Sequence, residues 1–307
     1  MNTFELAGFS HEDAVATMRQ SVKLASDART QFLVESPQTN AAEVKIALSL
    51  GPYGATLKPA QEFYGFYPPP YGPQGLASSG PTRIAWTDEE LASGKQDNAI
   101  SALATFHLER VRKFAADPAT WDAVDILAFE TVPLTWEATA IRHAVARLNA
   151  ELTAEGKTLK PWWIGFVYPD GGLPQRTLTG APVNAIEAVR AAYGLDTSDT
   201  PVPTGIAVNC TRSEYLSSVV KEMESALPAN IRPWLVLYPN GGETYDPVTQ
   251  TWHGACAHTS GKGWARGLVD LTRRSVEHGS WEGVIVGGCC KTGPDEIAAL
   301  AEVLKTE

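Results

Sequence analysis

Six short apolar runs, rich in β-branched residues, alternate along the chain with longer segments in which apolar side chains recur at helical spacing. Continuous apolar runs of this length are typical of strands buried on both faces, which occur in parallel sheets joined by helices. The runs are Val44–Leu50, Val124–Phe129, Trp162–Val167, Gly205–Val208, Trp234–Leu237 and Gly283–Val286. The helical segments are His11–Phe32, Ala99–Ala116, Trp136–Thr153, Val183–Tyr193, Ser213–Ala226, Gly263–His278 and Pro294–Lys305. The alternation predicts an α/β fold with a parallel sheet.

Polar or glycine-rich segments directly follow the apolar runs, where a parallel sheet presents its carboxyl edge. They are Gly51–Gly54, Glu130–Thr131, Asn209–Cys210, Tyr238–Asn240 and Cys289–Cys290. In (β/α)8 barrels the active site lies at this edge. We therefore expect a TIM-type (β/α)8 barrel that carries its functional residues at the strand ends.

The number of predicted strands is too small for a closed barrel. About six strand–helix units are visible, and the chain opens with a helical segment rather than a strand. Either further strands lie in the long loops, such as the Pro/Gly/Tyr-rich segment Tyr64–Gly80, or this chain lacks the first part of its barrel. Neither an internal repeat nor a low-complexity tail divides the sequence, so residues 1–307 are expected to form one barrel domain.

Three cysteines end predicted strands: Cys210 follows one apolar run, and Cys289 and Cys290 follow another after Gly287–Gly288. Thiolates are preferred ligands of soft metal ions such as Zn²⁺, and strand ends that meet at one edge can bring three of them together. Adjacent side chains in a strand point to opposite faces, so the chain must leave the extended form at the cysteine pair. The two glycines would supply that freedom. Buried apolar cysteines that bind nothing are the alternative.

The overall charge and the apolar pattern exclude several classes of partner. The formal net charge is -10, which disfavours a nucleic-acid or anionic-membrane surface. No run approaches the roughly 18 apolar residues of a membrane span, and the first residues do not resemble a signal peptide. The 4 cysteines are therefore expected to be thiols of a cytoplasmic protein rather than disulfides.

Five blocks of the sequence resemble the zinc-dependent homocysteine S-methyltransferase family, whose members form (β/α)8 barrels. The blocks are GPYGA (Gly51–Ala55), FETVP (Phe129–Pro133) with Glu137, GIAVNCT (Gly205–Thr211), LYPNGGETYD (Leu237–Asp246) and GGCCKTGPDEI (Gly287–Ile297). They occur in the family's order over nearly the whole chain, and the Asn-Cys-Thr and Gly-Gly-Cys-Cys segments are the most specific. Residues Glu62, Gly65 and Tyr67 match a further family loop near the site. The family's barrel begins with an Asp-Gly-Gly-containing strand. Neither it nor the second strand is found here, which implies a barrel that is incomplete at its N-terminus.

The resemblance assigns roles to particular residues. Cys210, Cys289 and Cys290 would be the zinc ligands, and Asn240 would be a weak, exchangeable fourth ligand when substrate is absent. Glu130 would hold the amino group of homocysteine, because an ammonium needs a carboxylate partner.

The resemblance also implies the reaction. A methyl group would pass from S-methylmethionine or S-adenosylmethionine to homocysteine and give methionine. Zinc would favour the thiolate of homocysteine, which is the nucleophile, and the excess negative charge would attract a sulfonium donor. Alignment of the two sulfurs would allow a single in-line step without a general base.

Other interpretations stay open. The chain could be a zinc-binding pseudoenzyme or a truncated gene product without turnover. A thiol-dependent redox protein is disfavoured because no Cys-x-x-Cys motif is present. A second cluster, His253, Cys256 and His258, also combines ligands that bind soft metals, in a predicted loop.

Overall fold

The main sheet of the protein is parallel and follows the chain order. The computed structural model describes residues 4, 7–77, 83–194, 200–241, 244–246, 249, 251–253 and 261–306. Within these residues the sheet has the order β1-β2-β3-β4-β5-β8. The strands are β1 (Ala47–Leu50), β2 (Ile126–Val132), β3 (Trp162–Phe166), β4 (Gly205–Asn209), β5 (Trp234–Tyr238) and β8 (Gly283–Val286). Each predicted apolar run forms one of these strands, so the predicted α/β class is confirmed.

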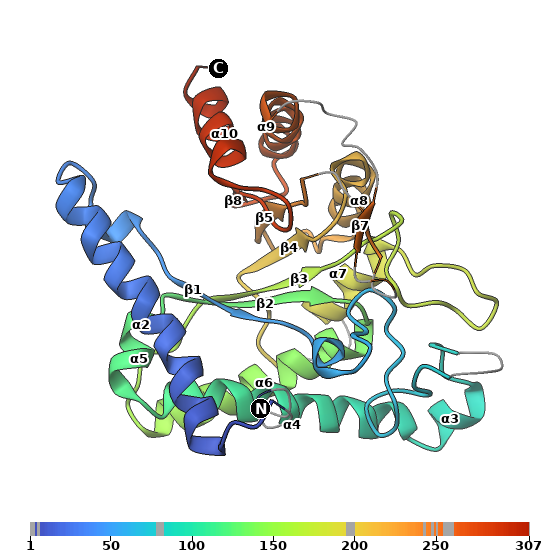
Figure 1. The fold of residues 1–307 in the computed structure, drawn as a ribbon. Helices are drawn as coiled ribbons and strands as arrows, with labels where there is room; N and C mark the ends of the chain where they lie inside the picture. The colour runs from blue at the N-terminus through green and yellow to red at the C-terminus, as the bar shows by residue number, and fades with distance from the viewer. Residues whose placement is uncertain are drawn as a thin grey trace.

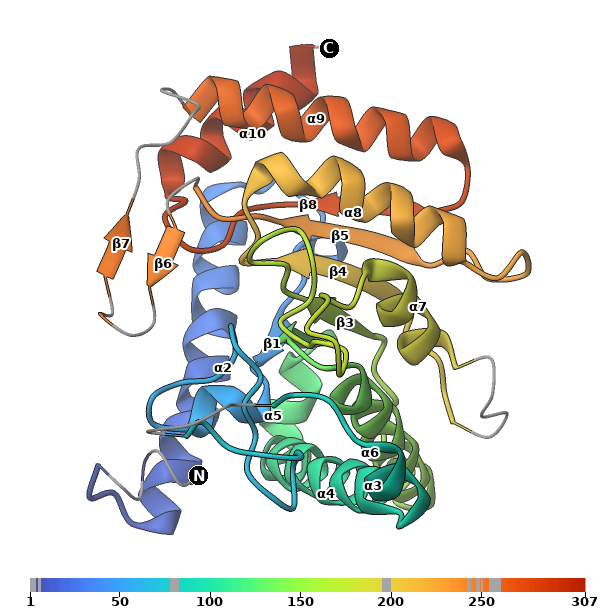
Figure 2. The ribbon, with the colours of Figure 1, turned by 90° about the vertical axis from the view of Figure 1, so that its right-hand side faces the viewer.

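Helices cover the sheet in the same order in which they follow the strands. The long helices are α2 (His11–Glu35), α4 (Lys95–Ala115), α6 (Thr135–Ala154), α7 (Ala185–Tyr193), α8 (Ser213–Ala226), α9 (Gly261–His278) and α10 (Pro294–Thr306). From α4 to α10, α5 apart, each of them packs on the next. Figures 1 and 2 show them following the sheet as it curves, from α4 and α6 near β1 and β2 to α9 and α10 beside β8. This is the outer helical layer of a TIM-type barrel.

The barrel is not closed in the part of the chain that the structure describes. Strands β1 and β8 lie at opposite edges of the sheet and do not pair. The long loops add no parallel strand within the described ranges, so the idea that they hide the missing strands is wrong there. They contain an antiparallel hairpin of β6 (Thr244–Asp246) and β7 (Thr251–His253) instead. The open edge also leaves apolar surface uncovered: Ile285 is 40% exposed, whereas its neighbour in register, Val236, is 3% exposed.

The short α-helices α3 and α5 are started by side-chain caps, and two 3-10 helices, Ala41–Glu43 and Tyr53–Thr56, flank β1. Helix α3 (Asp88–Ala92) begins with a capping box between Thr87 and Glu90. Helix α5 (Pro118–Ala123) begins after Asp117, whose carboxylate accepts a hydrogen bond from the amide of Thr120. No helix in the described ranges is long and apolar enough to cross a membrane.

Candidate functional site

The thiol of Cys210 and those of the distant pair Cys289 and Cys290 meet at the carboxyl edge of the sheet. The Sγ atom of Cys210 lies 2.7 Å from that of Cys289 and 3.9 Å from that of Cys290. The Cys289 and Cys290 sulfurs are 4.0 Å apart. All three residues are half-buried. They form the one group of potential metal ligands found among the described residues, so the structure brings together the three cysteines predicted from the sequence.

Left-handed backbone conformations turn the strand ends toward this cluster. Among the described residues, a positive φ at a non-glycine residue occurs at Thr131, Cys210 and Lys291, with φ of 58°, 49° and 62°. Thr131 is the penultimate residue of β2, Cys210 directly follows β4, and Lys291 lies in the turn after β8. Such conformations cost roughly 1–3 kcal/mol and persist only where surrounding contacts hold them. The strain therefore concentrates at the candidate site.

The cysteine pair is held by the loop after β5. The amide of Cys289 donates to the carbonyl oxygen of Pro239 at 2.8 Å, and the amide of Gly241 donates to that of Cys290 at 2.8 Å. A Cβ on Gly241 would lie 2.1 Å from the carbonyl oxygen of Lys291, so only glycine allows the two loops to approach this closely.

The expected role of Gly287–Gly288 needs correction. Neither residue has a positive φ, and the left-handed turn lies at Lys291 instead. A Cβ on Gly288 would lie 2.2 Å from Oγ1 of Thr292. Thr292 in turn donates from its hydroxyl to the carbonyl oxygen of Cys289 at 2.5 Å. Gly288 therefore provides space for a side chain that fixes the turn, rather than conformational freedom.

Asn209 and Thr211, which flank Cys210, tie the end of β4 to the end of β2 and to the segment after β3. The side chain of Asn209 accepts a hydrogen bond from the amide of Thr131 at 2.8 Å and donates to its hydroxyl at 2.7 Å. The hydroxyl of Thr211 accepts from the amide of Tyr168 at 3.0 Å and donates to the carbonyl oxygen of Asn209 at 3.0 Å. Both residues are buried. We did not assign them these positioning roles from the sequence, although both belong to the Asn-Cys-Thr block.

The thiols share their protons unequally. Hydrogen bonds from Cys210 and Cys289 lower the pKa of the Cys290 thiol to about 3. The hydrogen bond to Cys289 is the largest of the effects that raise the pKa of Cys210. The cluster therefore holds a thiolate, the form of cysteine that binds metals.

Glu130 lies beside the thiols and is oriented by two hydroxyl groups. Ser49 of β1 donates a hydrogen bond to Oε2 of Glu130, and Tyr238 of β5 is a second partner. Burial raises the pKa of Glu130 above its usual value, the two hydrogen bonds lower it in part, and the charge of Cys289 raises it. The pKa of Tyr238 is raised well above its usual value, first by burial, so its hydroxyl stays protonated and donates.

Asn240 lies two residues after the end of β5 and is 5% exposed. Its amide donates to the carbonyl oxygen of Thr211 at 3.1 Å, and its carbonyl oxygen accepts from the indole of Trp264 at 3.3 Å. It therefore belongs to the segment that holds the cysteines.

Of the second predicted cluster, His253 ends β7 and its Nε2 lies 2.7 Å from the hydroxyl of Thr251. Cys256 and His258 lie outside the described residues.

A buried carboxylate on α6 anchors the loop that follows β1. Glu137 accepts hydrogen bonds from the amide of Tyr53 and the hydroxyl of Tyr67, both at 2.7 Å. Its Oε1 also lies 3.0 Å from Nε2 of His107. The guanidinium of Arg110 lies 3.1 Å from Nδ1 of His107 and can only donate, so Nε2 carries the proton that Glu137 accepts.

The anchored loop carries Glu62 toward the thiols. Its Oε2 atom is buried and has no hydrogen-bond partner among the described residues. Burial raises the pKa of Glu62, and the negative charge of Glu62 is among the influences that raise the pKa of Cys290. The charge of a second carboxylate, carried by the loop after β1, thus acts on the cluster.

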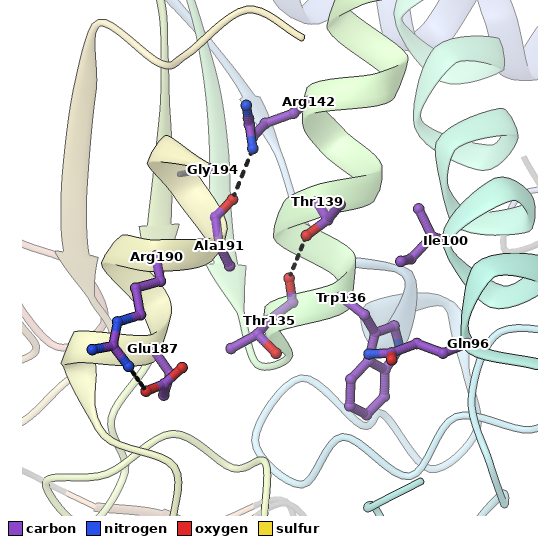
Figure 3. Close-up of a pocket in the computed structure, with 10 residues that line it drawn as sticks. All are labelled: Gln96, Ile100, Thr135, Trp136, Thr139, Arg142, Glu187, Arg190, Ala191 and Gly194. Atoms are coloured by element: carbon purple, nitrogen blue, oxygen red, sulfur yellow. Dashed lines mark hydrogen bonds and ion pairs between the residues drawn. The ribbon is translucent and has the colours of Figure 1, made fainter. Parts of the chain in front are cut away.

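A groove lies elsewhere, among the outer helices. It has a volume of about 590 Å³ and is lined by residues of α4, α6 and α7. Figure 3 shows Arg142 donating to the carbonyl oxygen of Ala191, and Arg190 paired with Glu187, around this groove. None of the site residues above lines it, so it is separate from the candidate site.

Comparisons with known proteins identify the relatives of the chain. The model of the homocysteine S-methyltransferase family matches residues 1–304. Homocysteine S-methyltransferase YbgG of Bacillus subtilis (strain 168) is 31% identical over 308 residues, which cover 99% of this chain and 76% of that protein. Homocysteine S-methyltransferase of Escherichia coli (strain K12) is 28% identical and matches 97% of this chain and 74% of its own length.

A solved structure shows the same fold. The crystal structure of the homocysteine methyltransferase MmuM from Escherichia coli, in its metallated form, superposes with a TM-score of 0.62 and 24% identity. The match covers 98% of this chain and 75% of that one. Together with the match to the family model over nearly every residue, these similarities show that the chain belongs to the homocysteine S-methyltransferase family.

Proposed function

We propose that this protein transfers a methyl group from a sulfonium donor, S-methylmethionine or S-adenosylmethionine, to homocysteine, forming methionine, and that it does so as a zinc enzyme. The observation that carries the proposal is the convergence of Cys210, Cys289 and Cys290 at the carboxyl edge of the sheet. The relatives named above are homocysteine S-methyltransferases, and the structural neighbour is a metallated form, which supports both parts of the proposal.

The donor set fits zinc. Three thiolates beside one open position are a ligand arrangement of catalytic zinc. With Zn–S bonds of about 2.3 Å, tetrahedral geometry separates the sulfurs by about 3.8 Å. The separations of Cys290 from Cys210 and Cys289, 3.9 and 4.0 Å, agree with this value. The Cys210–Cys289 pair would open by about 1 Å. Asn240 follows β5 next to this cluster and is proposed as a weak ligand that substrate displaces.

The residues of the chain bind and orient the acceptor. Glu130, held by Ser49 and Tyr238, would pair with the ammonium group of homocysteine and so direct its sulfur toward the three thiolates. A zinc ion bound there would supply a Lewis acid that favours the thiolate form of the acceptor. Fixing both sulfurs in line is the contribution expected of the pocket.

The transfer step needs no proton donor or acceptor from the chain. The homocysteine sulfur forms a bond to the methyl carbon while the carbon–sulfur bond of the donor breaks, and the electron pair of that bond stays on the donor sulfur. The donor leaves as a neutral thioether. The cluster of thiolates, anionic overall, would favour the approach of the cationic donor and not retain the neutral product.

The direct test is a methyl-transfer assay on purified protein with homocysteine and each sulfonium donor, with zinc measured on the same sample. We expect methionine to form with at least one donor and a chelator to abolish its formation. One zinc per chain without turnover of either donor would contradict the proposed activity and favour a zinc-binding pseudoenzyme.

Replacing Glu130 with glutamine is expected to keep the zinc but to weaken homocysteine binding by about 1.5–3 kcal/mol, the scale of a hydrogen bond to a charged group. The amide keeps the shape of the side chain and removes the charge that an ammonium needs. Calorimetric titration with homocysteine measures the effect, and Glu89→Gln on the exposed face of α3 is the matched control. Unchanged affinity in Glu130→Gln would rule out this role.

A further inference from the structure

One carboxylate near the thiols is still without a role. Glu62 lies in the loop after β1, and the amide of the preceding residue, Gln61, donates to the carbonyl oxygen of Gly54 at 2.9 Å. Three residues on, the amide of Gly65 returns to the carbonyl oxygen of Gln61 at 2.7 Å. The hydroxyl of Tyr67 is bonded to the buried Glu137. The backbone on both sides of Glu62 is therefore fixed.

The burial of the Glu62 carboxylate is only partly compensated in the protein alone: burial raises its pKa, and a hydrogen bond from its own backbone amide lowers it in part. Its Oε2 atom is buried without a hydrogen-bond partner among the described residues. A buried ionised oxygen without a partner costs free energy. The neighbouring Cys290 adds to this cost, because a negative charge there repels a carboxylate. A cation from solution would relieve both penalties.

We propose that Glu62 is the counter-ion of the sulfonium group of the methyl donor and so helps to select a cationic donor. This inference rests on the proposed function. The reacting sulfonium must lie in line with the acceptor sulfur, close to the thiolates. Glu62 lies in the loop that follows β1 at the carboxyl edge, and its charge acts on Cys290. Glu130 is less suited to this role, because Ser49 and Tyr238 already bond to its carboxylate.

The reaction determines how the contribution of Glu62 changes with time. The sulfonium carries a full positive charge in the bound donor, part of it in the transition state, and none in the thioether product. Attraction to Glu62 is therefore strongest before the reaction, so it contributes to binding of the donor more than to the chemical step. The attraction to Glu62 is lost once the methyl group has been transferred, and this loss favours release of the neutral thioether product.

The test is steady-state kinetics of Glu62→Gln with each substrate varied in turn. We expect the KM of the donor to rise about 10-fold, equivalent to about 1.4 kcal/mol. The kcat should change less than about 3-fold, because the charge declines toward the transition state. The KM of homocysteine and the zinc content should be unchanged. Glu62→Asp, which keeps the charge, should recover part of the donor affinity, and Glu89→Gln is the control for an exposed charge.

The outcomes separate this inference from the proposed function. If the unmodified protein is active and Glu62→Gln keeps the donor KM, only the role of Glu62 is overturned. A rise in the KM of homocysteine instead would assign Glu62 to the acceptor and also overturn the proposal. If the unmodified protein shows no turnover, calorimetry with S-methylmethionine still decides: about 10-fold weaker binding to Glu62→Gln supports the assignment, and equal binding overturns it.

Discussion

Replacing Cys290 with alanine is expected to remove most of the zinc from the protein and to lower methyl transfer by at least about 10³-fold, or about 4 kcal/mol of activation free energy. Only two thiolate ligands would remain in the variant. The fourth ligand position of the proposed zinc site is exchangeable, so it cannot compensate for the loss of the third thiolate. Cys290 is also the thiol whose pKa the hydrogen bonds from Cys210 and Cys289 lower, so its loss removes the cysteine that most readily becomes a thiolate. Metal analysis and the methyl-transfer assay on the same preparation measure both effects.

Cys256→Ala provides the matched control, because Cys256 is the one cysteine of the sequence that is not among the three proposed ligands. It should keep both zinc and activity. If Cys256→Ala lost the metal while Cys210→Ala, Cys289→Ala and Cys290→Ala all retained it, the assignment of the zinc site would be wrong. That result would favour the His253, Cys256 and His258 cluster instead.

The elements of the sheet could be predicted because burial on both faces leaves a strong sequence signal. All six apolar runs form parallel strands, and the end of Gly283–Val286 agrees with β8 to the residue. The predicted end of β2 was too early, because the strand continues through Glu130 and Thr131 to Val132. A polar residue and a left-handed one interrupt the apolar pattern there, and contacts with Asn209 hold the strand together.

The short helices were missed although each has a local signal. Thr87 and Glu90 have the spacing of a capping box, and Asp117 directly precedes a proline at the first helical position. The hairpin of β6 and β7 was also missed, because its three-residue strands are too short to show an alternating pattern.

The ligands of the site were easier to predict than the residues that position them. Strand-end cysteines can be recognised in the sequence, and the structure places them within hydrogen-bonding distance of one another. The roles of Asn209, Thr211 and Glu137 depend on contacts between segments far apart in the chain. A single sequence contains no signal for such pairings. That the cysteines bind zinc and that residues 1–307 form one domain remain predictions.

Replacing Glu137 with alanine is expected to lower the free energy of unfolding by about 3–5 kcal/mol, the cost of breaking a buried charged network by removing one partner. The carboxylate accepts from the amide of Tyr53, the hydroxyl of Tyr67 and the ring of His107. Tyr67 and His107 are both fully buried, so water cannot replace the lost bonds. Urea denaturation should show a lower midpoint.

The same substitution should weaken donor binding, because Glu137 fixes the loop that carries Glu62. Glu151→Ala is the matched control: it changes the same residue type on the same helix, but Glu151 is 38% exposed and pairs with Arg112 at the surface. An exposed pair of this kind contributes about 0–1 kcal/mol, and its loss should leave the donor KM unchanged. Equal destabilisation in the two variants would show that α6 as a whole, and not the buried network of Glu137, holds the loop. A large loss of stability in Glu137→Ala with an unchanged donor KM would separate folding from donor binding and show that the loop keeps its place without its anchor.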